Sequence, residues 1–272
     1  MSKRGELGRN GPLALAFNGL FLAFMLAPIL VVCVVAFTPE GYLSLPRRGL
    51  SLRWFRAILD YPEFITAFRD SVWLGALSST IAIGFAVPAA LAIARYRFAG
   101  RETLLSLMMS PLMIPHVVLG IAFLRFFTQI GLTGNFFGLV IGHVIIVTPF
   151  ALRLVLAAST GMDQRIEHAA ASLGAEPFTV FRRVTLPLIL PGVVSGWVLA
   201  FITSFDEVSM TVFIASPATN TLPVRLFLYI QDNIDPLVCS ISTVLIVLMA
   251  VLMVVLDRVY GLDRLFVGTG KG

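Results

Sequence analysis

Six long apolar stretches, separated by shorter polar segments, make up most of the pattern along this chain. A helix needs about 20 consecutive apolar residues to cross the hydrocarbon core of a bilayer. Backbone N–H and C=O groups find no partners in lipid, so such stretches are expected to be helical. The pattern therefore predicts an all-α, polytopic membrane protein with six transmembrane helices, at residues 13–37, 71–94, 104–127, 136–158, 188–213 and 237–256.

The first apolar stretch follows Lys3, Arg4 and Arg9, and a cleaved signal peptide also begins with basic residues. Its apolar run is longer than the roughly 7–15 residues of a signal-peptide core, and no small-x-small cleavage site follows it directly. We therefore expect a retained helix. Residues 1–12 would be an N-terminal segment, residues 13–256 a single six-helix domain, and residues 257–272 a tail.

The composition excludes an ordinary soluble protein and offers no enzyme motif. Hydrophobic residues make up 58% of the chain and charged residues 13%, whereas soluble domains have roughly 45–50% and 25%. Cys33 and Cys239 lack the spacing of a metal or redox motif. The C-terminal GTGKG lacks the first glycine and the Ser or Thr of a phosphate-binding loop. We predict that the chain is not an enzyme and binds no metal or cofactor itself.

The net charge of +5 comes from basic residues that flank the apolar stretches, which indicates membrane orientation rather than nucleic-acid binding. Lys and Arg are more frequent at residues 1–12, 95–101, 160–187 and 257–272 than in the loops on the other side. Loops rich in Lys and Arg stay in the cytoplasm. Both termini and the 160–187 loop are therefore predicted to be cytoplasmic.

The 160–187 loop has strong local signals. Its three consecutive alanines, Ala169 to Ala171, favour a helix that stops at Gly174. A second short helix is expected after Pro177, and Pro187 is expected to restart the chain into the fifth transmembrane helix. Two interpretations fit this compact segment of small residues. It is either a surface that docks into a cleft of another protein or an ordinary solvent-exposed connecting loop.

The same loop resembles the cytoplasmic signature of ABC importer permeases, which reads E-A-A, three residues, G, nine residues, then I-x-L-P. Here Ala169-Ala170 precede Gly174 at that spacing, and nine residues later come Val184-Thr185-Leu186-Pro187. The chain thus resembles a six-span, type I importer permease over essentially its whole length. One position departs, because His168 stands where the motif has Glu, with Glu167 just before it.

The resemblance implies a set of partners. A separate ATPase dimer would bind ATP and Mg²⁺ and dock on this loop, while an extracytoplasmic solute-binding protein delivers the solute. A second permease subunit would complete the pore, with a homologous heterodimer favoured over a homodimer, in the bacterial inner membrane. The docking residues implied are Glu167, His168, Ala169, Ala170, Gly174, Arg182, Leu186 and Pro187.

Residues 204–214, 221–230 and 234–236 resemble the spermidine/putrescine class of these permeases more closely. The resemblance implies inward transport, by alternating access, of a small polar, cationic solute; the solute itself is not identified. An acidic pair near the outer end of the fifth helix would line its path, because acidic residues in a membrane usually face a cavity or a partner. The predicted path residues are Thr203, Asp206, Glu207 and Met210, whose spacing of three and four residues is that of one helix face. An ion pair with Arg125 or Arg69 is the alternative.

Other residues are predicted to shape the helices. Ser195 and Gly196 suit close helix packing. Prolines 88, 111, 115 and 149 interrupt predicted helices and are hypothesised to bend them where a gate moves. Two other functions also fit a polytopic chain: an ion-driven secondary transporter or channel, and a non-transporting scaffold. Co-purification of an ATPase subunit separates the importer from both.

Overall fold

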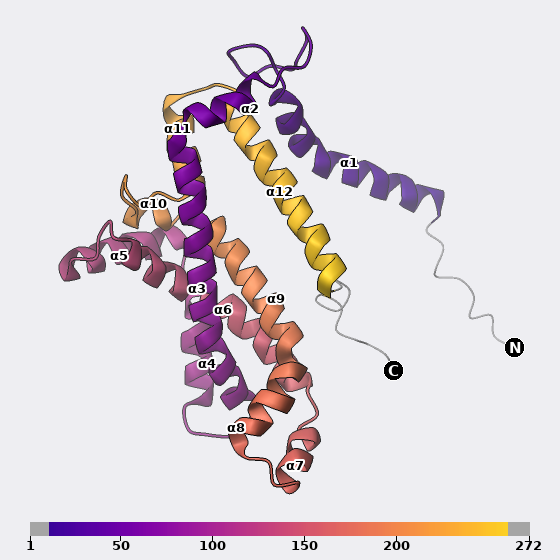
Figure 1. Ribbon diagram of the computed structural model, residues 1–272, viewed down its shortest axis with the longest axis vertical. Helices are drawn as coiled ribbons and strands as arrows, with labels where there is room; N and C mark the ends of the chain where they lie inside the picture. The colour runs from indigo at the N-terminus through magenta and orange to yellow at the C-terminus, as the bar shows by residue number, and fades with distance from the viewer. Residues whose placement is uncertain (1–10, 261–272) are drawn as a thin grey trace, which may run out of the picture. The chain divides into compact units, whose positions relative to one another are not determined.

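The computed structural model describes residues 11–260, and its elements are all helical within that range (Figure 1). Residues 1–10 of the predicted N-terminal segment and 261–272 of the predicted tail lie outside the described residues. In chain order the elements are α1 (Pro12–Val35), α2 (Arg53–Ala57), the 3₁₀ turn η1 (Ile58–Asp60), α3 (Pro62–Arg95), α4 (Arg101–Met109), the 3₁₀ turn η2 (Ser110–Met113), α5 (His116–Ile130), α6 (Phe136–Gly161), α7 (Arg165–Ser172), α8 (Pro177–Val180), the π turn η3 (Phe181–Thr185), α9 (Leu186–Phe205), α10 (Thr211–Ile214), α11 (Leu222–Asp232) and α12 (Leu237–Tyr260).

The chain divides into two compact units, with boundaries after Pro62, Tyr229 and Met253. The first unit contains α1, α2 and most of α12. There the Trp54 indole N–H donates to the Glu40 carbonyl oxygen at 3.0 Å, and the Ser240 hydroxyl donates to the Trp54 carbonyl oxygen at 3.1 Å. Helix α1 leaves nearly all of its apolar side chains exposed, as expected of a helix whose partner is lipid.

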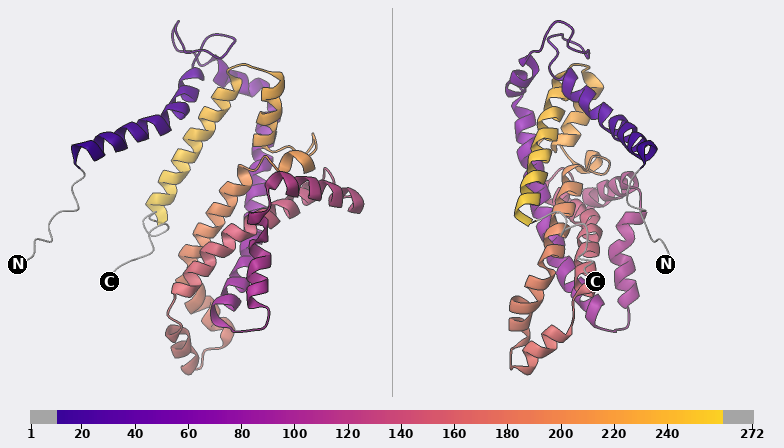
Figure 2. Two further views of the ribbon diagram at one scale, coloured as in Figure 1. Left: turned by 180° about the vertical axis from the view of Figure 1, so that it is seen from behind. Right: turned by 90° about the vertical axis from the view of Figure 1, so that its right-hand side faces the viewer.

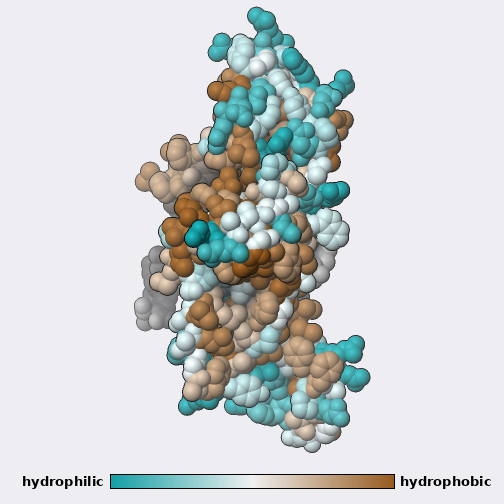
Figure 3. All heavy atoms as spheres, turned by 90° about the vertical axis from the view of Figure 1, so that its left-hand side faces the viewer, coloured by the Kyte–Doolittle hydropathy of each residue, from teal (hydrophilic) through white to brown (hydrophobic). Residues whose placement is uncertain are grey.

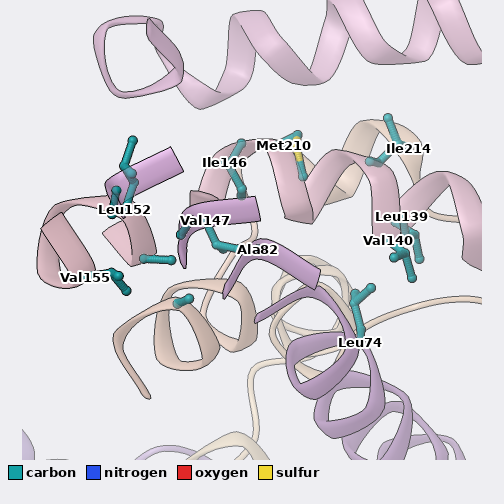
Figure 4. Packing of buried hydrophobic residues seen from close by; sticks show 14 of the residues in the cluster. Leu74, Ala82, Leu139, Val140, Ile146, Val147, Leu152, Val155, Met210 and Ile214 are labelled. Carbon is teal, nitrogen blue, oxygen red and sulfur yellow. The ribbon is translucent and has the colours of Figure 1, made fainter. Parts of the chain in front are cut away.

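The second unit contains α3 to α10 and the first part of α11, and its core lies between α3, α6 and α9. Figure 4 shows Leu74 and Ala82 of α3 together with Ile146 and Val147 of α6 in this core. Figure 3 shows hydrophobic residues along the middle of the unit and hydrophilic residues at the end that carries α7 and α8. This distribution matches a body that lies in lipid with one end in water.

Helices α6 and α9 run side by side (Figure 2) because small residues let their backbones approach closely. A Cβ atom placed on Gly192 would lie 2.4 Å from the Ala158 Cβ atom, and one on Gly196 would lie 3.1 Å from the Ala151 carbonyl oxygen. The predicted packing role of Gly196 is confirmed. Gly192, one turn earlier on the same face, is the tighter of the two positions.

Among the described residues, four helices are long and apolar enough to cross a membrane, and a bent pair would make a fifth span. The four are α1, α3, α6 and the continuous helix Pro177–Phe205, while α12 contains the shorter apolar stretch Leu237–Val251. The multi-span, all-α prediction is therefore confirmed, and six spans remain a proposal.

The third predicted helix is wrong as a single straight span. Residues 104–127 fall on α4, η2 and α5, and the helices Arg101–Met113 and His116–Ile130 meet at 103°. Pro115 explains the break, because a proline disfavours the α conformation of the residue before it, and Ile114 is extended with φ −99° and ψ 128°. The predicted bend is thus present at Pro115, whereas Pro111 lies inside the helix Arg101–Met113, and Pro88 and Pro149 lie within α3 and α6.

The fifth predicted helix differs at both ends. Residues 188–213 were expected to be helical, but the helix runs from Pro177 to Phe205 and then stops. The short helix expected after Pro177 is not separate from the span, because the π turn η3 joins α8 to α9. Pro187 and Pro191 are accommodated within α9. A π turn changes the hydrogen-bond register by one residue, so the missing N–H of Pro187 does not end the helix.

Candidate functional site

The first candidate site is the 160–187 loop, which lies at the end of the second unit farthest from α11 (Figures 1 and 2). Helix α7 ends at Ser172, and Gly174 has φ +85°. The Gly174 N–H donates to the Ala171 carbonyl oxygen at 2.9 Å, and the Ala175 N–H donates to that of Ala170 at 3.2 Å. This is a Schellman motif, which favours glycine at the left-handed position. The predicted helix and its glycine stop are confirmed.

The loop carries large apolar side chains that are exposed. Leu173 is 90% exposed and Phe178 is 70% exposed. Neither was among the predicted docking residues. Of those, His168, Ala169, Gly174, Arg182 and Pro187 are exposed, while Ala170 and Leu186 are half-buried. Large apolar side chains gathered on a solvated turn are typical of protein-interaction surfaces.

Glu167 does not share this surface. Its side chain is 13% exposed and forms an ion pair with the Arg95 guanidinium. The Thr185 hydroxyl also donates a hydrogen bond to Glu167. His168, the next residue, points outward instead. Of the two candidates for the anchoring position of the motif, the structure therefore exposes the histidine, while the glutamate is half-buried and paired within the chain.

The second candidate site is the other end of α9, where the chain breaks between Phe205 and Thr211. The expectation that Thr203, Glu207 and Met210 share one helix face is wrong, because residues 206–210 are not helical. Asp206 is exposed and Thr203 is half-buried, whereas Glu207 and Met210 are buried. The predicted path residues thus lie in two different environments.

Glu207 is 6% exposed and bonded on both carboxylate oxygens. Its Oε2 lies 2.6 Å from the Nδ1 of His116, the first residue of α5. Its Oε1 accepts the Met210 N–H at 2.7 Å. The alternative prediction, an ion pair with Arg125 or Arg69, is wrong for Glu207. The side chain that its carboxylate contacts is His116. These bonds fix the break after α9 to the bend before α5.

A buried histidine near the same break was missed by sequence reasoning. His143 of α6 is fully buried, with Nδ1 2.7 Å from the Ser204 Oγ and Nε2 3.0 Å from the Thr211 Oγ1. It therefore joins the last turn of α9 to the first residue of α10. A lone histidine in an apolar stretch was the available signal, because a polar side chain at that depth needs partners.

No group of three or more His, Cys, Asp or Glu side chains that could hold a metal ion occurs within the part of the chain that the structure describes. The polar clusters at the two ends of α9 instead join helices through hydrogen bonds and one ion pair. These contacts hold helices together, which is a structural role that a transport protein can use.

Comparison with known protein families identifies the functional class of the chain. Residues 82–262 match the model of the family described as "Binding-protein-dependent transport system inner membrane component". The chain belongs to this family. It is a permease subunit of an ABC importer, located in the inner membrane, and it is not the ATPase. Family membership accounts for the loop signature, which neither an ion-driven carrier nor a scaffold explains.

Individual relatives and structures agree. The chain is 30% identical to the spermidine/putrescine transport system permease protein PotC of Haemophilus influenzae, covering 88% of this chain and 93% of that one. It is 29% identical to PotC of Escherichia coli K12 over 98% of each chain, and 27% identical to the putrescine permease PotI of that strain over 84% and 83%. A bacterial ABC transporter that imports alginate matches with a TM-score of 0.74 at 17% identity, covering 92% of this chain and 96% of that one. The MetNI methionine transporter matches with a TM-score of 0.59 at 18% identity, over 72% and 94%.

Proposed function

We propose that this chain forms half of the membrane pore of an ATP-driven importer for a small, cationic, polyamine-like solute. The 160–187 loop carries this proposal: it combines the spacing of the importer signature with the exposed apolar side chains of Leu173 and Phe178. The relatives support the choice of solute. Those that are 27–30% identical over most of the chain are spermidine/putrescine and putrescine permeases.

The proposed topology has six spans with both termini in the cytoplasm. The bent pair α4–α5 would be the third span and α12 the sixth, added to the four helices that meet the length criterion. The basic residues around the 160–187 loop support the same orientation. The loop then faces the cytoplasm, while the break after α9 lies toward the outer side.

The proposed docking surface centres on five exposed residues of the loop, His168, Ala169, Leu173, Gly174 and Phe178. An ATPase dimer that binds ATP and Mg²⁺ would hold this surface, and its closure would move the loop. A second, homologous permease subunit would complete the pore. An extracytoplasmic solute-binding protein would deliver the solute on the other side. Since α8 continues into α9, displacement of the loop is passed directly to a membrane-spanning helix.

The exposed carboxylate at the outer end of α9 supports a cationic solute. Asp206 is exposed, so it can meet a solute ammonium group, while Glu207 is occupied by His116 and the Met210 N–H. Of the two acids, we assign the path role to Asp206. Thr203, half-buried one turn earlier, donates its hydroxyl to the Leu199 carbonyl oxygen at 2.8 Å.

Co-purification tests the docking surface. The chain is expressed with its ATPase subunit and second permease, and the amount of ATPase retained by the chain is measured in detergent. Leu173→Asp should lower that amount about tenfold, because it places a charge in a desolvated contact. Leu50→Asp is the matched control, since Leu50 is 77% exposed in a loop outside the proposed surface. Equal retention by both variants would show that the loop is not the docking surface.

A further inference from the structure

The inward-facing carboxylate of Glu167 joins three segments that are distant in sequence. Arg95 is the last residue of α3, Glu167 lies in the first turn of α7, and Thr185 closes the π turn before α9. The Arg95 guanidinium and the Thr185 hydroxyl both donate to the same oxygen, Oε1 of Glu167. A single side chain thus connects the loop to two of the long helices in the second unit.

The charges of Arg95 and Glu167 are favourable at the helix ends where they lie. The C-terminal end of a helix is negative and its N-terminal end positive. Arg95 therefore lies at the favourable end of α3 and Glu167 at the favourable end of α7. Both side chains are mostly buried, with 18% and 13% exposure. Arg95 Nε is buried with no hydrogen-bond partner among the described residues, so the guanidinium depends on Glu167 for its charge compensation.

The third contact lies at the joint between the loop and the membrane. Thr185 is fully buried and is the last residue of the π turn that links α8 to α9. Single π turns within α-helices are rare and often occur at functional positions. The hydroxyl bond to Glu167 fixes α7 to this turn, so α7 and the start of α9 are held together.

We infer that Glu167 is the positioning residue that couples the 160–187 loop to the membrane helices, so that a displacement of the loop moves α3 and α9 together. The inference rests on the proposed docking function of the loop. It gives Glu167 a role different from that of the exposed residues: it does not contact the ATPase, and it transmits the movement that the ATPase produces. Loss of this link should separate ATP hydrolysis from transport while leaving the docking surface intact.

The test uses Glu167→Gln in the full complex, reconstituted in proteoliposomes with the partner solute-binding protein and radiolabelled spermidine as the probe. ATPase retention should equal that of the wild type. The ratio of spermidine transported to ATP hydrolysed should fall about fivefold or more, within the range that coupling between sites usually spans. Because this ratio does not depend on the amount of folded protein, a purely structural role would leave it unchanged.

Two further variants complete the design. Glu176→Gln removes an exposed carboxylate from the same loop and should leave the ratio unchanged. Thr185→Val keeps the shape and the Arg95–Glu167 pair but removes one donor, so the ratio should fall by a smaller factor, about twofold to threefold. A wild-type ratio in both Glu167→Gln and Thr185→Val overturns the coupling role. Loss of ATPase retention in Glu167→Gln also overturns it, since Glu167 would then be a docking contact. Failure of the unmodified chain to retain the ATPase would instead refute the proposed docking function.

Discussion

The acidic side chains near the two ends of α9 have similar surroundings but different partners. At each end, one of two neighbouring polar residues is turned inward and the other is exposed: Glu167 is half-buried beside exposed His168, and Glu207 is buried beside exposed Asp206. At the first end, the inward-turned carboxylate holds a guanidinium and a hydroxyl from other helices. At the second, it holds an imidazole and a backbone N–H where the helix stops.

The difference lies in what each carboxylate joins. Glu167 connects elements that are each intact helices or turns, so it can pass a movement from one to the next. Glu207 supplies an acceptor for the N–H of Met210 at a break in the chain, where the helical bond is missing. A buried backbone donor without a partner is costly. We conclude that Glu207 mainly stabilises the break; under the proposed function, the exposed neighbour at each end would meet the external partner.

The largest expected effect on stability is at the second end. Glu207→Ala removes the acceptor for both His116 and the Met210 N–H, so the free energy of unfolding should fall by about 2–4 kcal/mol. Thermal unfolding of the purified chain in detergent, followed by loss of the monodisperse peak, measures the change. Glu102→Ala is a matched control, because its side chain is 82% exposed and pairs only with its neighbour Arg101 at 3.6 Å in the described contacts. Equal melting of both variants would contradict the role of Glu207.

The middle of α9 gives the next effect, through packing rather than polar contacts. Gly192→Ala places a Cβ atom 2.4 Å from the Ala158 Cβ and 2.9 Å from the Leu154 carbonyl oxygen. Overpacking of this kind should lower the free energy of unfolding by about 1–3 kcal/mol. The same unfolding assay measures it.

Gly84→Ala is the control for helix propensity. Nothing lies within 4 Å of a Cβ placed at Gly84 in α3, and alanine is favoured over glycine in a helix by roughly 1 kcal/mol. This variant should therefore be as stable as the wild type or more so. If Gly192→Ala were also stabilising, the close approach of α6 and α9 would be wrong.

Sequence reasoning found what local signals specify. The apolar stretches located the long helices, and the alanine run with Gly174 located the turn after α7, because a left-handed position and a helix stop are local properties. Pro111 and Pro115 also indicated a bend, although the single span drawn through them hid how sharp it is. A continuous helix through Pro187 was not predicted, since it depends on a π turn that has no clear local signal.

The partners of the inward-turned acids could not be predicted. Arg95 and Glu167 are 72 residues apart, and His116 and Glu207 are 91 apart. The first pairing depends on how α3 and α7 pack and the second on how α5 packs against the end of α9, and periodicity specifies neither. For the same reason, assigning Thr203, Glu207 and Met210 to one face assumed a helix that had already ended.

The bond between His143 and Ser204 should contribute less than the Glu207 cluster. Ser204→Ala removes one buried hydroxyl and leaves the His143 Nδ1 without that partner. Hydrogen bonds between membrane helices contribute about 0.6 kcal/mol on average and seldom more than about 1.7. The unfolding assay should therefore show a loss of about 1 kcal/mol. Ser195→Ala is the control, because its hydroxyl donates to the Pro191 carbonyl oxygen within the same helix; a loss as large there would mean that the bond to His143 adds nothing specific.

The smallest effect on stability is expected at Asp206, and this variant separates the exposed acid from the buried one. Asp206→Asn changes an exposed side chain, so the free energy of unfolding should stay within about 0.5 kcal/mol of the wild type. Spermidine uptake in proteoliposomes should nevertheless fall about fivefold, because an exposed ion pair contributes up to roughly 1 kcal/mol. Glu207→Gln should show the reverse order, with reduced stability and, in the protein that remains folded, nearly normal uptake. If Asp206→Asn left the concentration dependence of uptake unchanged, the cation would not meet α9 at this residue, and the two ends of the helix would differ only in how they are stabilised.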